Sequence, residues 1–554
     1  MLMHFAIPLL AAGLTYAQSL CPRPAPGAIL KAPPELRSSN GSLRVDFALR
    51  TSVDVYGVRN YCYIYGDSIQ SPALRVRPGD EVVLNLKNEL PAAGSDNEGK
   101  HQHDFVTTQG NPCASSAMTA SSTNLHFHGL NLPPVCRQDE VLRTVVQPGD
   151  APFEYRFKIP PNEPPGLYWY HPHPHGFSER QVLGGASGAL IVEGIESAAP
   201  VVAGLPERIL VLRDQSMPGE ERELSTDRDD PHASLDMSLN YVPIRHPHNR
   251  PAVMVVPPGK REFWRVLNAA ADSFFVLRLL YWPNQDTQVG QTMHVIAIDG
   301  VPVGSDFASI ARPTILLPPG SRAEFVVTTP AAGVFGQLLT ERYDNGPFGD
   351  VNTYRVLANI RSAPDAPAAP GAMPNVPSSL EGRPFVGLTS LQPVRERLLY
   401  FSEKFGDPAH PKRSASYYLT AGDAKPKVFD MNSPGTDLTA VQGTVEDWTI
   451  ENRAEEAHVF HIHQLHFQLL ERDGKRVTES ALRDTIDVPY WDGKSSTYPR
   501  VKLRMDFRNP NIIGTFLYHC HILEHEDGGM MGSIALIAPQ VQQPASPGNH
   551  ARKK

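Results

Sequence analysis

The sequence predicts an all-β protein of three consecutive, similar Greek-key domains, each a β-sandwich or barrel. Proline supplies 53 of the 554 residues, about twice its usual share, which favours short strands and turns over long helices. Short segments of alternating apolar and polar residues are separated by Pro and Gly, a pattern typical of sandwiches and barrels. Two strand motifs also recur three times along the chain, which predicts three copies of one domain.

The first repeated motif is a glycine, a mostly alternating apolar strand, and an asparagine nine residues after the glycine. The second motif is a shorter strand that also begins with glycine. The first motif occupies residues 79–88, 259–268 and 443–452, and the second occupies residues 166–171, 333–338 and 514–519. The starting glycines at 79, 259 and 443 are 180 and 184 residues apart, and such nearly equal spacing is expected of tandem copies.

These repeats, together with the composition between them, set the expected boundaries. The segment between the second and third copies is rich in proline, and residues 91–123, with His101, His103 and Cys113, are expected to form a long loop inserted in the first copy. We expect a signal peptide at 1–17, domains at 20–196, 203–361 and 385–540, a proline-rich linker at 362–384 and a flexible tail at 541–554.

The N-terminus predicts export. An apolar run at 5–14 is followed by small residues at 15–17, as in a secretory signal peptide. The run is shorter than the roughly 20 residues that cross a bilayer, and the alternative is a buried N-terminal segment. We therefore expect a secreted or periplasmic protein with no stable membrane insertion. Four cysteines could form two disulfides in such a compartment, with three possible connectivities left open: Cys21, Cys62, Cys113 and Cys136.

Composition excludes two broad classes of protein. Hydrophobic residues make up 41% and charged residues 20% of the chain, which is ordinary globular composition and excludes a largely disordered chain. The 51 basic and 59 acidic side chains give a net charge of -8, which gives no support for a nucleic-acid partner.

The 21 histidines of the chain carry its strongest functional signal. A single histidine is more often structural than ligating, but residues i and i+2 of a strand face the same side, so each His-x-His pair directs two imidazoles one way. Eight such imidazoles without alternating carboxylates favour a copper cluster over calcium or magnesium. The pairs are His126/His128, His171/His173, His461/His463 and His519/His521.

A second metal site is expected on the opposite side of the same strands. Cys520 lies between His519 and His521, so its sulfur faces away from theirs, and His458 has the opposite parity to His461. With His525 and Met530 downstream, two histidines, one cysteine and a weak methionine form the ligand set of a blue-copper electron-transfer centre. The two sites would then be joined covalently through Cys520.

The middle copy lacks these ligands. Leu338 stands where the other copies have His171 and His519, and counting from Asn268 places Leu277 and Leu279 where the third copy has its His461/His463 pair. We therefore expect the histidine cluster at the interface between the first and third copies. The middle domain would space them and line a substrate surface.

The histidine motifs resemble the four copper signatures of the three-domain multicopper oxidases. They are His126-Phe-His128-Gly, His171-Pro-His173, His458-Val-Phe-His461-Ile-His463 and His519-Cys520-His521-x-x-x-His525-x-x-x-x-Met530. The likeness covers about residues 40–540, and the His-Glu-Asp and paired Met of the last motif are similar to bacterial-type laccases. Phe127 and Val459 replace a common Trp and Pro, and neither is a ligand.

The resemblance implies cupredoxin-like domains and four copper ions. By its pattern, His458, Cys520, His525 and Met530 hold a type 1 copper, and an axial Met indicates a modest potential. His126 and His461 hold a type 2 copper. The type 3 pair is held by His128, His171, His173, His463, His519 and His521. The implied reaction is four one-electron oxidations of a reductant coupled to reduction of dioxygen to two waters.

Two carboxylates are candidates for supplying protons to dioxygen reduction. Glu526 matches an acid that assists dioxygen reduction in spore-coat laccases, and Asp139 matches a second such acid with an alignment offset of about two residues. The alternative for both is a solvated or salt-bridged surface acid. His175 is expected outside the ligand set, and His466, His294 and the His246/His248 pair have no spacing that ties them to the copper sites.

The favoured reductants are phenols and aromatic amines, bound in a shallow apolar groove beside His525, and we expect a monomer that takes dioxygen and a small reductant. A metallo-oxidase for Cu(I) or Fe(II) is the main alternative, disfavoured because the 12 methionines are scattered with no Met-rich segment in 340–440. A bilirubin-oxidase-like specificity stays open. A non-catalytic electron carrier or scaffold would not need the full ligand set, and zinc hydrolase chemistry would not explain Cys520.

Overall fold

A computed structural model describes most of the chain. It covers residues 19–539 except 93–110, 115–117, 218–233, 248, 304–309, 365, 367–386, 407–414, 434 and 478–480. The expected signal peptide, the tail, most of the linker, His101, His103 and His248 lie outside the described residues. No helix within them is long and apolar enough to cross a membrane.

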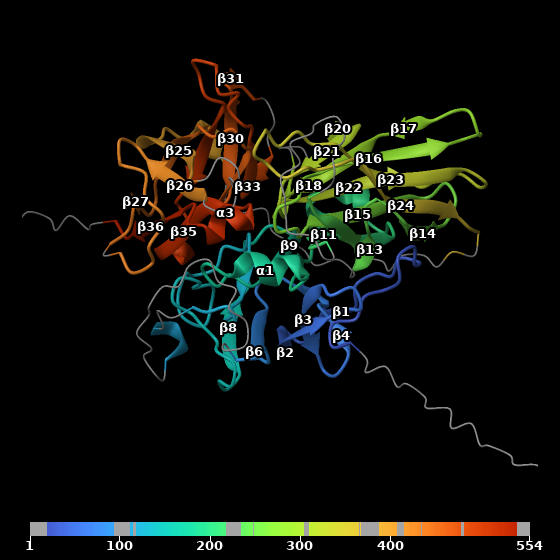
Figure 1. Ribbon diagram of the computed structural model, residues 1–554, viewed down its shortest axis with the longest axis horizontal. Helices are drawn as coiled ribbons and strands as arrows, with labels where there is room; N and C mark the ends of the chain where they lie inside the picture. Colours follow the sequence, from blue (N-terminus) through green and yellow to red (C-terminus); the bar gives the residue numbers. More distant parts are fainter. Residues whose placement is uncertain are drawn as a thin grey trace, which may run out of the picture.

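The protein is all-β, and its six sheets form three pairs that follow one another along the chain (Figure 1). The first pair is built from residues 35–192. One sheet contains β1 (Glu35–Arg37), β5 (Ala73–Val76), β10 (Gly188–Val192), β9 (Gly166–His171) and β7 (His126–His128). The other contains β4 (Ile69–Gln70), β3 (Arg59–Tyr65), β2 (Ser42–Val53), β6 (Glu81–Asn88) and β8 (Phe153–Lys158).

The middle pair is built from residues 207–362. One sheet contains β13 (Val242–Ile244), β12 (Asp236–Leu239), β11 (Glu207–Gln215), β15 (Arg261–Asn268), β22 (Arg322–Thr328), β18 (Met293–Ile298), β19 (Val301–Pro302) and β20 (Ile310–Arg312). The other contains β14 (Ala252–Val256), β24 (Arg355–Ser362), β23 (Phe335–Glu341), β16 (Phe275–Trp282), β17 (Val289–Gln291) and β21 (Thr314–Leu317).

The third pair is built from residues 395–537. One sheet contains β26 (Ala415–Ala421), β25 (Arg395–Phe405), β28 (Val445–Asn452), β34 (Arg500–Asp506), β30 (Phe467–Arg472), β31 (Lys475–Arg476) and β32 (Leu482–Arg483). The other contains β27 (Leu438–Val441), β36 (Met531–Ile537), β35 (Gly514–Cys520), β29 (His458–Ile462) and β33 (Thr485–Val488).

Helices are short and few among the described residues. They are α1 (Ser178–Leu183), α2 (Ile195–Ala198) and α3 (Leu523–Asp527), with 3-10 turns η1 (Pro112–Ala114), η2 (Pro200–Val202), η3 (Leu388–Ser390) and η5 (Pro510–Ile512).

The three units repeat one topology. In each, the strand that carries the first sequence motif pairs in parallel with an earlier strand: β6 with β2, β15 with β11, and β28 with β25. In each, the strand that carries the second motif pairs antiparallel with the strand or segment that holds the matching ligand positions: β9 with β7, β23 with β16, and β35 with β29. The repeats found in the sequence are therefore repeats of structure.

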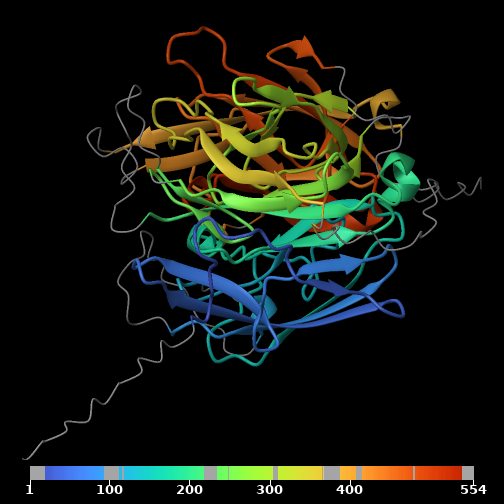
Figure 2. The ribbon, with the colours of Figure 1, turned by 90° about the vertical axis from the view of Figure 1, so that its right-hand side faces the viewer.

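Each sheet pair encloses its own apolar core, and the units also pack against one another. Alternation along β2 buries Leu43, Val45, Phe47 and Leu49 and leaves the residues between them toward solvent. A separate buried cluster that includes Trp169, Leu167 and Val211 joins the first unit to the middle one. Figures 1 and 2 show the first unit (blue to cyan) beneath the other two, so each unit borders both others.

Two disulfides lie in the first unit. Cys21 is bonded to Cys62 and Cys113 to Cys136, which confirms two disulfides among these four cysteines and settles the connectivity that the sequence left open. Cys520 is free and buried.

Candidate metal centres

Strand register places the paired histidines opposite each other. His126 lies opposite His171 across β7 and β9, and His461 lies opposite His519 across β29 and β35. At the same place in the middle unit Leu279 lies opposite Leu338. The sequence count, which matched Leu277 and Leu279 to His461 and His463, is therefore wrong by two residues, because the segment from the asparagine to the matching position is 11 residues long in the middle unit (279-268) and 9 in the third (461-452).

The eight paired histidines form one buried cluster between the first and third units. Each is at most 1% exposed. Rings from the two units stack on each other, His126 on His463 and His128 on His461, with centroids 4.0 Å apart in both cases. His519 Nε2 lies 3.1 Å from His463 Nε2 and 3.4 Å from His173 Nε2.

Hydrogen bonds fix which ring nitrogen of several histidines carries the proton. The Nδ1 atoms of His171, His461 and His519 donate to the backbone oxygens of Pro172, Asp484 and Cys520 at 2.9, 2.7 and 2.9 Å. Each ring then presents the lone pair of Nε2. A second partner that holds a histidine in one tautomer is the usual arrangement around a bound metal.

Two carboxylates act on the other rings. Asp139 Oδ1 lies 3.0 Å from His126 Nδ1 and also accepts the backbone N–H of Phe127 at 2.9 Å. Asp484 Oδ1 lies 3.1 Å from His128 Nε2. The remaining ring nitrogen of His126 is therefore Nε2, and that of His128 is Nδ1. Each points away from the carboxylate that contacts its ring.

Burial favours the neutral, metal-binding form of the cluster. It lowers the pKa of seven of these imidazoles below the ordinary value, and repulsion between neighbouring histidines lowers most of the seven further. For His521 the pKa falls to about 3. The others with a lowered pKa are His128, His171, His173, His461, His463 and His519.

A second set of donors lies on the opposite face of β35. Cys520 Sγ is 3.6 Å from His458 Nδ1 and 3.7 Å from His525 Nδ1, and these two nitrogens are 3.1 Å apart. Met530 is fully buried, and its backbone oxygen accepts the N–H of Cys520 at 3.0 Å. Burial raises the pKa of the Cys520 thiol, which a bound cation would offset because it favours the thiolate.

The donor atoms fit copper in both places. Groups of ligand atoms within 4.8 Å of one another include His458/Cys520/His525, His126/His461/His463 and His173/His463/His519. Several buried ring nitrogens have no hydrogen-bond partner among the described residues, which is costly unless a metal occupies the space between them. These atoms are Nε2 of His126, His171 and His461, Nδ1 of His128 and His463, and both nitrogens of His521. Imidazole and thiolate donors without hard oxygen ligands suit copper.

The two candidate proton donors both touch the cluster. Asp139 contacts His126, as described above, and accepts a bond from Gln464 Nε2 at 2.6 Å. Glu526 Oε2 lies 3.3 Å from His519 Nδ1 and its Oε1 lies 3.5 Å from His173 Nε2. Burial and the neighbouring Asp527 raise the pKa of Glu526 well above its ordinary value, which favours the protonated form of this carboxyl. Neither residue is a solvated surface acid.

Among the described residues His525 is fully buried, contrary to the open apolar groove expected beside it. Tyr417 stacks on its ring with centroids 4.5 Å apart. Glu456 Oε2 lies 3.5 Å from His525 Nε2, and Glu403 Oε1 lies 3.3 Å from His458 Nε2. In this conformation a reductant cannot touch the His525 ring directly.

Sequence reasoning missed a polar network beside the cluster. Asp484, Arg322 and His466 are fully buried, and Asp484 contacts both of the others, although His466 has no spacing that ties it to the histidine motifs. Burial alone would raise the pKa of Asp484, but Arg322 lowers it to about 2. His175, by contrast, packs against Phe429 outside the cluster.

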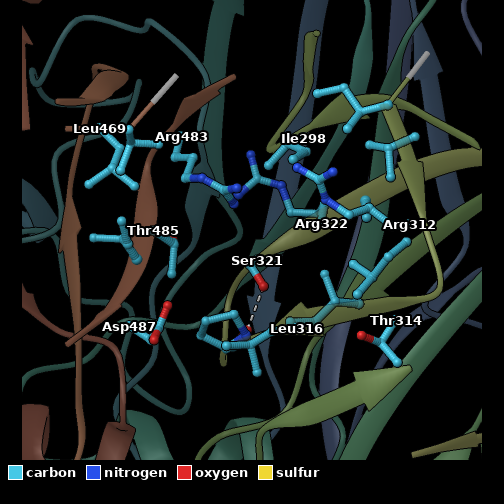
Figure 3. Close-up of a pocket in the computed structure, with 18 of the residues that line it drawn as sticks. Ile298, Arg312, Thr314, Leu316, Ser321, Arg322, Leu469, Arg483, Thr485 and Asp487 are labelled. Carbon is cyan, nitrogen blue, oxygen red and sulfur yellow. Dashed lines mark hydrogen bonds between the residues drawn. The ribbon is translucent and has the colours of Figure 1, made fainter. Parts of the chain in front are cut away.

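A cavity of about 270 Å³ lies between the middle and third units (Figure 3). Arg322 and Ser321 line it from the middle unit and Thr485 from the third. The Thr485 hydroxyl is 3.4 Å from His461 Nδ1, so the cavity is separated from the histidine cluster by one layer of side chains.

Family models described as multicopper oxidase match residues 115–197 and 408–538. Between them, these two segments contain all twelve predicted copper ligands. The chain belongs to the multicopper oxidase family. It is accordingly a copper-dependent oxidoreductase, and the middle unit, where the ligand positions are leucines, lies outside both matched segments.

Full-length relatives agree with this membership. A multicopper oxidase of Staphylococcus aureus is 23% identical over 475 residues, which is 85% of this chain and 83% of the relative. Two solved structures share the fold. One is a Campylobacter jejuni multicopper oxidase described as a metallo-oxidase, with 24% identity, a TM-score of 0.65 and coverage of 94% of this chain and 98% of that chain. The other is a laccase-like multicopper oxidase of Ochrobactrum sp., described as active towards lignin model compounds, with 22% identity, a TM-score of 0.63 and coverage of 92% and 100%.

Proposed function

We propose that this multicopper oxidase is laccase-like. It couples four one-electron oxidations of a phenol or aromatic amine to the four-electron reduction of dioxygen to water, and it uses four copper ions. His458, Cys520, His525 and Met530 hold the type 1 ion, and His126 and His461 hold the type 2 ion. The remaining six histidines of the cluster hold the type 3 pair: His128, His171, His173, His463, His519 and His521.

One observation carries the two-site copper chemistry of the proposal, while the laccase-like substrate class rests on the sequence resemblance. Cys520 Sγ lies within 3.7 Å of His458 and His525, while its chain neighbours His519 and His521 belong to the histidine cluster. Copper bound in both sets would supply one-electron oxidation at one and dioxygen reduction at the other. Cys520 and the peptide bonds beside it give the short covalent path for electrons between them, and Glu526, whose Oε2 lies 3.3 Å from His519 Nδ1, is placed to give a proton there.

A metallo-oxidase for Cu(I) or Fe(II) is the second candidate, and the carboxylate layer favours it. Glu403 and Glu456 place oxygen atoms 3.3 and 3.5 Å from the outer nitrogens of His458 and His525. Carboxylates attract small cations, whereas phenols are bulkier and need access that the buried His525 does not offer. The Campylobacter jejuni relative is described as a metallo-oxidase, and the Ochrobactrum one as laccase-like.

Oxygen uptake by the copper-loaded protein tests the proposal, with a methoxyphenol compared with Cu(I) under matched conditions. Rapid uptake with the phenol and slow uptake with Cu(I) is the expected result. The reverse would replace the laccase-like proposal with the metallo-oxidase. No uptake with either, at full copper loading, would reject both and favour an electron carrier. Export, predicted from residues 1–17, is tested separately by locating the processed N-terminus in the culture medium or periplasm.

A further inference from the structure

Arg322 begins β22 in the unit that has no copper ligands, yet its side chain contacts all three units. Its Nη1 and Nη2 donate to Asp484 Oδ1 and Oδ2 of the third unit at 2.8 and 2.7 Å. Its Nε donates to the backbone oxygen of Leu167 in the first unit at 3.1 Å. The guanidinium is fully buried, and paired, parallel hydrogen bonds to a carboxylate fix orientation as well as distance.

Asp484 passes this orientation on to two histidines of the cluster. Its carboxylate lies 3.1 Å from His128 Nε2, in the first unit, and its backbone oxygen accepts from His461 Nδ1 at 2.7 Å, in the third. These two rings stack on each other. A single residue thus selects the tautomers of both rings, and Arg322 donates to both of its carboxylate oxygens, while the Thr485 hydroxyl donates to Oδ1 at 2.8 Å.

The backbone approaches this ion pair closely. A Cβ atom at Gly129, directly after His128, would lie 2.5 Å from Arg322 Nη2 and 2.7 Å from Asp484 Oδ2. A Cβ atom at Gly320, two residues before Arg322, would lie 2.7 Å from His521 Nε2. Both glycines have positive φ, so the sequence keeps these positions free of side chains where the middle unit meets the cluster.

We propose that Arg322 is a positioning residue for dioxygen reduction: it fixes Asp484 and thereby sets the orientation of the His128 and His461 rings. The middle unit then does more than separate the other two, because it supplies the cation that completes the cluster's surroundings. This inference rests on the proposed function in one respect, namely that the cluster binds copper and reduces dioxygen.

The test separates the two halves of the catalytic cycle in Arg322→Ala. Anaerobic bleaching of the blue Cys520 centre by a reductant reports electron entry, and its return on mixing with dioxygen reports the cluster. We expect bleaching within twofold of the parent, reoxidation slowed at least tenfold, and less copper bound per chain. Equal slowing of both phases, or normal reoxidation and copper content, would overturn the proposal.

Chemical rescue distinguishes positioning from general loss of packing. The cavity of about 270 Å³ that Arg322 lines (Figure 3) has room for a guanidinium ion. Millimolar guanidinium is expected to restore reoxidation at least threefold in Arg322→Ala and to leave Asp484→Asn unchanged, because the latter lacks the carboxylate. Restoration in both variants, or in neither, contradicts a specific ion pair.

Two further variants keep the test decisive. Arg322→Lys retains the charge but not the two parallel bonds, so if the alanine variant does not fold we expect slower reoxidation, by at least threefold, in the lysine variant. Arg355→Lys is the matched control, since Arg355 is equally buried and donates to the backbone oxygens of Ile244 and Leu235 within the middle unit. In this variant, bleaching and reoxidation are both expected at the rates of the parent protein. A parent protein with no blue centre, or none that reoxidises, would reject the proposed function instead.

Discussion

The middle and third units place different side chains on the same pair of strands. In the middle unit Leu279 faces Leu338 within an apolar core, whereas in the third unit His461 faces His519 within the histidine cluster. The parallel and antiparallel pairings around these strands are alike. The sheet scaffold therefore tolerates either use, and side-chain identity at a few register positions decides whether a unit packs or binds metal.

The difference also shows what a ligand-free unit can contribute. The middle unit sends Arg322 into the interface, and its Gly320 leaves room for the His521 ring. The described ligand positions there are leucines, but the unit still contacts the cluster.

The largest effect is expected from Cys520→Ser. The hydroxyl is a poor copper ligand, and the path between the two donor sets loses its sulfur, so oxidase activity should fall by roughly three orders of magnitude or more. The blue colour should disappear as well. Oxygen uptake and the visible spectrum measure these changes, and a coloured, active serine variant would mean that Cys520 is not part of the centre.

The next prediction contrasts equivalent positions in the two units. Leu279→Ala should lower the free energy of unfolding of the copper-free protein by about 2–5 kcal/mol, since it opens a cavity in a full core, and leave copper content unchanged. His461→Ala should cost the copper-free protein less than about 2 kcal/mol, because one backbone hydrogen bond is lost, but abolish most oxygen uptake. Denaturant unfolding and metal analysis compare them, and identical profiles for the two variants would refute the comparison.

A buried acid in the first unit makes the stability of a histidine-bearing unit depend on pH. Burial raises the pKa of Glu163 to about 8, and Asn131, three residues after His128, donates to it at 2.8 Å. The folded protein therefore keeps a proton that the unfolded chain releases above about pH 4.5. The contribution of this retained proton to the free energy of unfolding is complete below about pH 4.5 and is lost as the pH rises to 8.

Glu163→Gln should remove this dependence. Between pH 4.5 and 8 the variant should gain stability over the parent by on the order of 3–5 kcal/mol. Chemical unfolding of the copper-free proteins across this range measures the gap. A gap that stays constant with pH would show that Glu163 is ionised in the fold.

The smallest effect concerns the carboxylate layer over His458 and His525. If a metal ion is the reductant, Glu403→Gln and Glu456→Gln should each slow Cu(I) oxidation by about tenfold, an effect on the order of 1.4 kcal/mol, and leave methoxyphenol oxidation within twofold. The proposed laccase-like function instead predicts similar, small changes with both reductants. Initial rates of oxygen uptake with each reductant decide between them.

Much of the site could be read from the sequence because it depends on period-two geometry along single strands. His-x-His spacing placed each pair on one face, and the parity of Cys520 placed its sulfur with His458 and His525. Asp484, Arg322 and Glu456 could not be found this way, since each meets the histidines across a unit boundary or a loop. The two-residue error at Leu277 has a similar origin. Counting residues along the chain does not show how many of them lie between one strand and the matching position of the next.

The burial of His525 could not be predicted from the sequence either. Whether its outer edge meets solvent depends on how Tyr417 and Glu456 pack over it, and nothing in the spacing of the last histidine motif encodes that packing. The disulfide connectivity likewise required Cys21 to be placed beside Cys62.

Anomalous diffraction at the copper absorption edge, from crystals of the copper-loaded protein, tests the central claim most directly. The account predicts one copper peak among His458, Cys520 and His525, and three peaks enclosed by the eight histidines between the first and third units. It also predicts none in the middle unit near Leu279 and Leu338. An empty histidine cluster, or copper absent beside Cys520 in fully loaded protein, would contradict it.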